Sequence, residues 1–155
     1  MKILVVYDSY FGNTEKVAQA IGEALGDDVA VKRPGEVQNG ELSGLDLLIV
    51  GAPTRGFRPS DGIKDFLKKI PSGELKGVKV AAFDTRIARE DAKNPVLRFM
   101  IGVFGYAAKP IGDNLARKGG EPVGEPAGFA VLDTEGPLKD GELERAASWA
   151  KTLVS

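Results

Sequence analysis

A run of small and hydroxyl-bearing residues near the start of the chain could bind an anion. It consists of Ser9, Tyr10, Phe11, Gly12, Asn13 and Thr14. The run comes directly after residues 3–7, which form an apolar segment typical of a buried strand, and it leads into a helical pattern. At such a turn, consecutive backbone N–H groups can point at one anion, and the positive end of the helix dipole faces the same point. The sequence therefore predicts a phosphate site on residues 9–14.

A simpler interpretation of the same turn is purely structural. Asn13 or Thr14 would only cap the following helix, and Gly12 would only make the turn. A bare cap, however, requires neither a serine upstream nor a glycine, which favours the phosphate site. The neighbouring Asp8 would repel an anion if it pointed inward, so we expect it to point away and accept a hydrogen bond from the turn. Lys16 is the only cation close by in sequence, so the backbone must carry the binding.

The composition restricts the chemistry that the side chains can perform. The chain has 155 residues, of which 43% are hydrophobic, and it contains no His and no Cys. The absence of both excludes a Ser-His-Asp triad, a thiolate nucleophile and imidazole or thiolate metal ligands. We therefore expect no catalytic side chain and no metal site, and any redox chemistry must come from a cofactor.

The charge balance and the hydropathy indicate where the protein works. The 21 Lys and Arg residues nearly cancel the 22 Asp and Glu residues, so no overall field attracts nucleic acid. No apolar stretch reaches the 18 or so residues that a membrane span requires, and no cationic segment precedes an apolar stretch at the N-terminus. We expect a cytoplasmic protein that neither binds nucleic acid nor inserts into membranes.

The order of apolar segments predicts the fold class. Strand-like runs cover residues 2–8, 28–33, 46–52, 78–83 and 126–132. Helical spacing is expected from Asn13 or Thr14 to Gly26, from Pro59 and Ser60 to Pro71, from Ala108 to Gly119, and from a cap at Asp140 to Leu153. This alternation predicts an α/β protein with a parallel sheet and helices on both faces, formed as a single domain over residues 1–155.

The phosphate turn resembles that of a known family. Six positions fit its pattern: Tyr7, Ser9, Gly12, Thr14, Ala18 and Ile21. The pattern is similar to the phosphate loop of flavodoxins, whose ligand is the terminal phosphate of FMN. The resemblance implies a flavodoxin-like three-layer sandwich with a five-stranded parallel sheet of order 2-1-3-4-5. It also implies FMN as the cofactor, and not FAD, because no second glycine-rich turn is available for an adenylate.

The resemblance assigns the rest of the site to the loops after the third and fourth strands. In flavodoxins the first of these loops holds one face of the isoalloxazine ring, which here implicates Pro53, Thr54, Arg55, Gly56 and Phe57. A Thr-x-Gly unit common in the family is matched, although an arginine stands where an aromatic residue is frequent. The structural alternative is a rigid surface loop bracketed by prolines. The second loop implicates Asp84, Thr85 and Arg86 at the pyrimidine edge, and it lacks the Tyr that usually stacks on the outer flavin face.

The connection over residues 84–105 is too long for an ordinary link between a strand and a helix. Its second half, Pro95 to Tyr106, is apolar. Three interpretations are open: a lid over the cofactor, a surface through which two copies of the chain associate, or core packing. We expect this segment to cover the cofactor or a second subunit, because an exposed apolar patch of this size is uncommon on a monomer.

These features predict an FMN-binding protein that carries one or two electrons between redox partner proteins. One alternative is an FMN-dependent reductase that acts on NAD(P)H or a quinone, which the long segment favours because a substrate needs walls. A second alternative is a module of the same fold that has lost its flavin.

Overall fold

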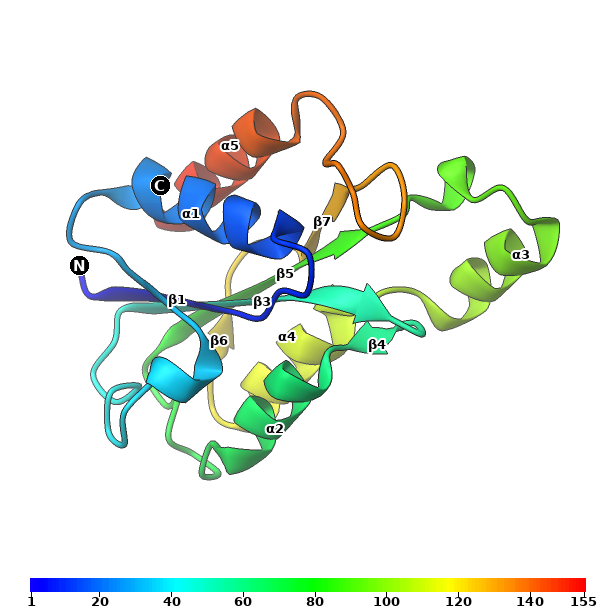
Figure 1. Ribbon diagram of the computed structural model, residues 1–155. Helices are drawn as coiled ribbons and strands as arrows, with labels where there is room; N and C mark the ends of the chain where they lie inside the picture. The colour runs from blue at the N-terminus through cyan, green and yellow to red at the C-terminus, as the bar shows by residue number, and fades with distance from the viewer.

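The computed structural model describes residues 1–155 and has a central parallel sheet between two layers of helices (Figure 1). The parallel strands are β1 (Ile3–Tyr7), β2 (Ala30–Lys32), β3 (Leu47–Arg55), β5 (Lys79–Arg86), β6 (Glu121–Pro122) and β7 (Ala127–Ala130). Their order is β2-β1-β3-β5, and both β6 and β7 then pair with β5. This confirms the predicted α/β class and flavodoxin-like arrangement.

The sheet has seven strands where five were expected. The first addition is β4 (Arg58–Pro59), which turns back and pairs antiparallel with the end of β3. The second addition is β6, which pairs with β5 just before the predicted fifth strand. The strand expected over residues 126–132 is β7, and Pro122 and Pro126, which have no N–H to donate to a neighbouring strand, stand between the two.

Five α-helices cover the sheet or flank it. They are α1 (Asn13–Leu25), α2 (Asp61–Lys69), α3 (Pro95–Phe104), α4 (Ala108–Arg117) and α5 (Glu142–Val154), with short 3₁₀ turns η1 (Pro34–Glu36) and η2 (Arg89–Asp91). Helices α1 and α5 cover one face of the sheet and α2 and α4 cover the other, whereas α3 projects beyond the carboxyl ends of the strands (Figure 1). None of the helices has the length and apolar character that a membrane crossing requires.

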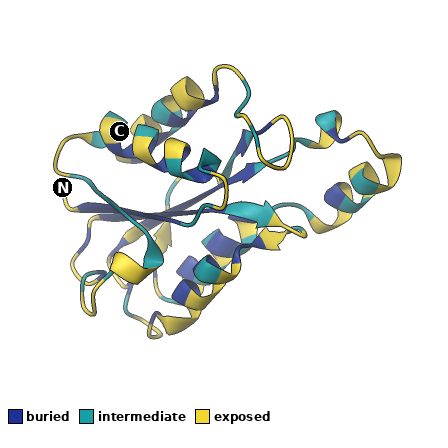
Figure 2. Ribbon diagram, in the orientation of Figure 1, coloured by how far each residue is buried: buried dark blue, intermediate teal, exposed yellow.

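The alternation of side chains along the strands divides the core in two. On one face, Val5 and Ile49 pack with Val17 and Ile21 of α1. On the other face, residues such as Val50 pack against α2 and α4. Figure 2 shows the buried residues concentrated along the sheet and on the helix sides that face it. The continuous apolar runs in β1 and β3 follow from this burial on both sides.

The helix starts differ from the sequence prediction. Helix α5 is preceded by Gly141 in a left-handed conformation, and no side chain caps it, so the predicted Asp140 cap is wrong. Helix α1 likewise has Gly12 at its N-cap, with φ of 91°, and neither Asn13 nor Thr14 caps it. The capping role predicted for Asn13 or Thr14 in the structural interpretation is therefore wrong, whereas Gly12 does make the turn. The side chains of Asn13 and Thr14 are available for other contacts.

Two strands extend further than predicted and carry candidate site residues with them. Strand β3 continues to Arg55, and β5 continues to Arg86 because Asp84, Thr85 and Arg86 pair with Gly128, Phe129 and Ala130 of β7. Asp84 and Arg86 lie two positions apart on one strand, so they share a face of the sheet, and Thr85 faces the other side.

Candidate functional site

A pocket opens beyond the carboxyl ends of β1, β3 and β5, where the strand order reverses. Its volume is about 200 Å³, below the roughly 300–1,000 Å³ of sites that enclose a drug-sized ligand. A ligand of that size must remain partly exposed here. Most of the predicted residues line it: Ser9, Tyr10, Phe11, Asn13, Thr14, Pro53, Thr54, Arg55, Gly56, Phe57, Thr85 and Arg86. Gly12 and Asp84 do not.

The turn between β1 and α1 presents backbone donors to this pocket. The N–H groups of Tyr10, Phe11, Asn13, Thr14 and Glu15 donate to no atom of the protein. The N–H of Gly12 is used within the turn, where it donates to Ser9 Oγ at 3.0 Å. Four of these five residues, all except Glu15, line the pocket. Unused donors at the positive end of α1 form a site suited to a multiply charged anion.

Asp8 points away from these donors, as expected. Its Oδ1 accepts the N–H of Ser9 at 2.9 Å and lies 3.5 Å from Nη1 of Arg33. Its Oδ2 lies beside Gly62 at the start of α2, where a Cβ would be 2.7 Å away. The negative charge is therefore turned toward Arg33 and α2, so the anion site avoids its repulsion.

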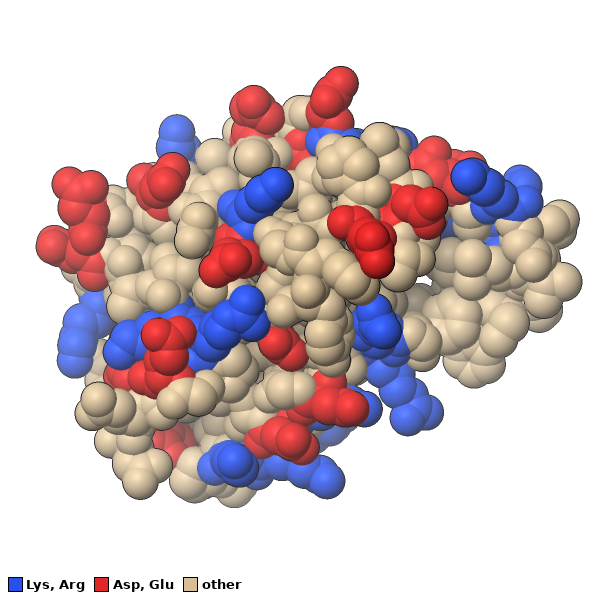
Figure 3. Space-filling view, in the orientation of Figure 1, with Lys and Arg blue, Asp and Glu red and all other residues tan.

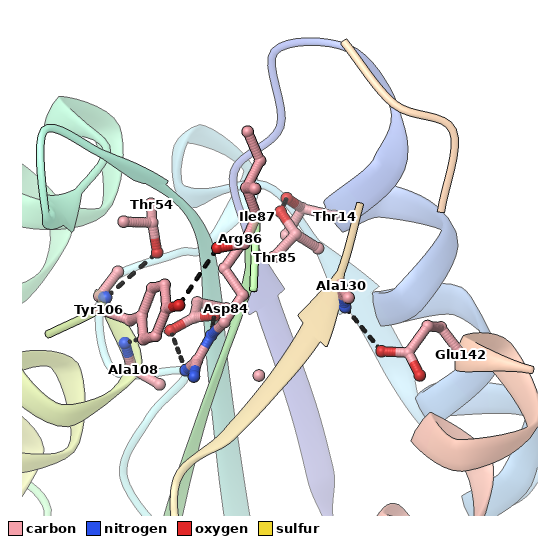
Figure 4. A network of polar contacts seen from close by, with 12 residues as sticks. Thr14, Thr54, Asp84, Thr85, Arg86, Ile87, Tyr106, Ala108, Ala130 and Glu142 are labelled. Carbon is pink, nitrogen blue, oxygen red and sulfur yellow. Dashed lines mark hydrogen bonds and ion pairs between the residues drawn. The ribbon is translucent and has the colours of Figure 1, made fainter. Parts of the chain in front are cut away.

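Side chains connect the first turn of α1 to distant segments. The hydroxyls of Thr14 and Thr85 lie 2.8 Å apart and are both buried (Figure 4). The side-chain amide of Asn13 donates to the carbonyl of Glu135 at 3.1 Å. The residues after β7 thus complete the pocket with Val131 and Thr134, two site residues that were not predicted from the sequence. The turn-forming residues that follow Val131 were the available signal.

The tip of β3 and β4 is a two-residue turn with positive φ at both Gly56 (55°) and Phe57 (69°). Such turns fit the twist of the flanking strands, but a positive φ is costly for a phenylalanine. The cost of order 1 kcal/mol is offset in part by the ring of Phe57, which packs on that of Phe104 at a centroid distance of 5.5 Å. The guanidinium of Arg55 lies 4.7 Å from the ring centre of Tyr10, and it joins the two loops.

Asp84 lies beneath the pocket, which corrects the prediction that it contacts a ligand. The residue is fully buried, and its carboxylate is already occupied. Arg86 donates to it from Nε at 2.6 Å and from Nη2 at 2.7 Å, and the N–H of Ala108 donates at 2.8 Å (Figure 4). Burial raises the pKa of Asp84, while Arg86 and the N–H of Ala108 oppose that rise.

Arg86 is held firmly by this arrangement. Its guanidinium lies 3.7 Å from the ring centre of Tyr106, and a Cβ at Gly128 would overlap it. The hydroxyl of Tyr106 donates to the carbonyl of Ile87 at 3.2 Å. The backbone N–H of Ala107 donates to Thr54 Oγ1 at 3.2 Å, which ties this cluster to β3. We call Asp84, Arg86, Tyr106 and Ala108 the Asp84 cluster.

The apolar segment after β5 forms α3, which sits at the mouth of the pocket. Leu97 and Ile101 line the pocket with Tyr106 and Ile87. Three of these four residues belong to the segment 95–106 that was expected to cover the cofactor or a second subunit, and Ile87 was not predicted. The opposite side of α3 is exposed. Of the three interpretations, core packing is wrong for most of the helix, because Ile101 is its one buried residue.

Comparison with known proteins decides the family. A model of the flavodoxin domain family matches residues 4–122. The chain belongs to the flavodoxin family. Over 89 residues it is 34% identical to a flavodoxin of Maridesulfovibrio salexigens, a match that covers 53% of this chain and 61% of the relative. Over 91 residues it is 32% identical to a flavodoxin of Aquifex aeolicus, covering 54% and 49% of the two chains.

The matches to these curated relatives span about half to three fifths of their length. Among solved structures, oxidised flavodoxin 2 of Bacillus cereus superposes with a TM-score of 0.77 at 23% identity, covering 99% of this chain and 98% of the other. This last likeness concerns the flavodoxin fold, and it extends over the whole chain.

Proposed function

We propose that this flavodoxin-family protein binds FMN in the pocket and carries one or two electrons between redox partner proteins. The observation that carries the proposal is the turn between β1 and α1, where five backbone N–H groups have no acceptor in the protein. Free donors at a helix start fit the dianionic phosphate of FMN. Relatives that are flavodoxins support the same cofactor.

The residues that would hold the phosphate are those of the turn. Ser9, Asn13 and Thr14 contribute polar side chains, and the backbone contributes the free N–H groups. A phosphate needs several donors because charge-assisted hydrogen bonds contribute about 1.5–3 kcal/mol each. Only one such cradle faces the pocket, which favours FMN over a dinucleotide.

The ring system would be bordered by the other two segments of the pocket. Thr54, Gly56 and Phe57 come from the tip of β3 and β4, and Tyr106 comes from the end of the α3 segment. Tyr10 stands at the mouth, half exposed, with the guanidinium of Arg55 against its ring. The bound cofactor supplies the electron-accepting chemistry, and these side chains orient it and limit its contact with water.

A ligand titration tests the cofactor. Quenching of flavin fluorescence should show that FMN binds at least tenfold more tightly than riboflavin, because riboflavin lacks the phosphate; about tenfold corresponds to one charge-assisted hydrogen bond. FAD should bind no more tightly than riboflavin. Equal affinities for FMN and riboflavin would remove the phosphate assignment, and no binding of either would indicate a module that has lost its flavin.

Steady-state kinetics separates the carrier from a reductase of the same fold. The wall that α3 adds to the pocket, through Leu97 and Ile101, is the feature that favours a substrate site. A carrier should oxidise NADH or NADPH only slowly when it is supplied alone with a quinone. Rapid, saturable turnover of either nucleotide would establish the reductase instead.

A further inference from the structure

One face of α3 is apolar and largely exposed, although the ring of Phe57 packs on that of Phe104. Val96, Phe99, Val103 and Phe104 are between 60% and 68% exposed. Figure 2 shows the helix at the edge of the molecule with its outer side exposed. We call these four residues the α3 face. Exposed apolar side chains gathered on one helix of a soluble domain mark an interaction site.

The α3 face is bordered mainly by positive charge. Residues 53–60 and 87–106, the two segments that flank it, contain Arg55, Arg58, Arg89, Lys93 and Arg98 against Glu90 and Asp91. Asp91 is paired with Lys139 at 2.5 Å, so only one of the two acids is free of an ion pair. In Figure 3 the arm that contains α3 is largely tan, with blue side chains above it and beside its base and red side chains where it joins the body.

Two of these cations are fixed on or beside the helix. Arg98 belongs to α3 itself, and its carbonyl accepts a hydrogen bond from Nε of Arg89 at 3.0 Å. A Cβ at Gly102 would lie 2.9 Å from Cζ of Arg89, so this guanidinium packs directly on the helix. Helix α3 has no acidic residue of its own. The face therefore combines an apolar centre with a cationic border.

We propose that the α3 face docks a redox partner protein that has an apolar contact surface bordered by Asp and Glu. This inference rests on the proposed function, because it names the partner for the pocket that α3 adjoins. The pocket leaves a bound cofactor partly exposed, and a partner seated on α3 would lie beside that opening. Apolar burial would hold the complex, and the opposite charges would steer its approach.

The size of the face fits a transient encounter. A stable interface uses roughly 20–30 residues on each side, whereas this face offers four apolar side chains and a few arginines. A second copy of the chain is disfavoured as the occupant. Two-fold pairing of the same face would bring two mainly cationic borders together, and α3 has no acidic residue to offset them.

Defined probes test the proposal on the FMN-loaded protein. The first is a labelled peptide of ~15 residues, long enough to form a marginal helix, with a Leu face bordered by Glu. The second is identical except that Lys replaces Glu. Fluorescence anisotropy should show that the Glu peptide binds. Its affinity should fall by about tenfold or more between about 50 mM and 0.5 M salt, because salt screens the charges. The Lys peptide should not bind.

Variants of the face provide the second arm. Phe99→Ser should lower the affinity for the Glu peptide by about tenfold or more, as expected for an apolar anchor. Arg98→Gln should lower this affinity less, and it should reduce the salt dependence of binding. The matched controls are Leu143→Ser, an exposed apolar residue on α5, and Arg117→Gln, an exposed cation on α4; both should bind as the parent does.

Three results would overturn the proposal. The first is equal binding of the two peptides, or binding that Phe99→Ser leaves unchanged. The second is a dimer in sedimentation that Phe99→Ser dissociates, which would make a second copy the occupant. The third is Phe99-dependent binding to vesicles with about one third phosphatidylserine, which would assign the face to a membrane surface. FMN titration of the same preparations keeps failure of this inference distinct from failure of the proposed function.

Discussion

The two sides of the pocket are built in opposite ways. On the α1 side, the helix buries Val17, Ala18 and Ile21 completely, and hydrogen bonds tie its first turn to β5 and to the residues after β7. On the α3 side, the helix buries only Ile101 and exposes most of its surface. The α1 wall of the pocket is part of the hydrophobic core, whereas the α3 wall is mostly exposed and only attached to the core.

This difference separates two tasks. A phosphate must find its donors already in position, since moving them during binding costs free energy. The α1 side therefore needs rigid attachment to the sheet. A wall that meets both a ring system and a partner needs less attachment, and helices with few buried apolar contacts open at a lower free energy than the core. The strongest anchor of the α3 side is the Asp84 cluster at its C-terminal end.

Breaking that anchor should have the largest effect on stability. Asp84→Asn removes the charge that pairs with Arg86, and we expect a loss of about 3 kcal/mol, the lower end for a buried ion pair because the side chain of Arg86 is partly exposed. Urea denaturation at neutral pH measures the loss. The control is Asp113→Asn, in an exposed pair with Lys109, which should change stability by less than about 0.5 kcal/mol. Similar losses for both variants would show that the buried pair is not an anchor.

Removing one hydrogen-bond donor from the α1 side of the pocket should weaken the binding of FMN more than that of riboflavin. Thr14→Ala should raise the Kd for FMN by roughly 10- to 100-fold, the value of one hydrogen bond to a charged group. Riboflavin serves as the matched control ligand, because its Kd should change little when only the phosphate contact is lost. An equal change for both ligands, measured by fluorescence quenching, would indicate that Thr14 acts through its bond to Thr85 on the shape of the pocket.

The two faces of α3 should respond differently to substitution. Ile101→Ala should cost about 2 kcal/mol of unfolding free energy, because it leaves a cavity under the helix, and it should weaken FMN binding. Phe99→Ser on the outer face should change both quantities little. Urea denaturation measures the unfolding free energy of both variants, and FMN titration measures their affinity for the cofactor. Equal destabilisation by Phe99→Ser would mean that the α3 face is covered within the protein.

A smaller, pH-dependent effect is expected at Glu142, which supports the residues after β7. Hydrogen bonds from Arg145 and from the N–H of Ala130 hold the pKa of this carboxyl below its ordinary value of 4.5. A group whose pKa is lowered by folding stabilises the protein above the unfolded pKa, and this contribution disappears as the pH falls through the folded pKa.

Glu142→Gln should therefore lower the free energy of unfolding by about 1 kcal/mol at pH 7, and the difference from the parent should shrink below about pH 4. Urea denaturation at the two pH values measures it. Glu144→Gln, an exposed position on the same helix, is the control and should show no such trend. A difference that grows in acid would contradict the sign of the shift.

Local patterns sufficed to predict the family fold and most of the pocket. The turn at residues 9–14 was legible because its residue types, its glycine and its place between a strand and a helix all act locally. The orientation of Asp84 could not be predicted from the sequence, because its carboxylate accepts a hydrogen bond from the N–H of Ala108, 24 positions away. The contribution of Val131 and Thr134 depends on the bond from Asn13 to Glu135, which joins segments 122 positions apart.

The division of α3 into two faces was also beyond the sequence pattern. The segment is apolar almost throughout, so no periodicity separates Leu97 and Ile101 from Val96 and Phe99. Which side meets the pocket is decided by where β5 ends and by the ring contact between Phe57 and Phe104. Such a choice is made by tertiary packing.

The absence of a Cβ at Gly128 limits how related flavodoxin sequences can diverge at this position. Arg86 reaches Asp84 and the ring of Tyr106 only because no Cβ stands at Gly128, where one would overlap the guanidinium. A homologue that acquires any side chain at this position must lose the arginine at the position of Arg86 or carry it in another direction, and the acid at the position of Asp84 would then be left buried without its partner. We expect these positions to covary across related sequences, with glycine at 128 accompanying the Asp–Arg pair.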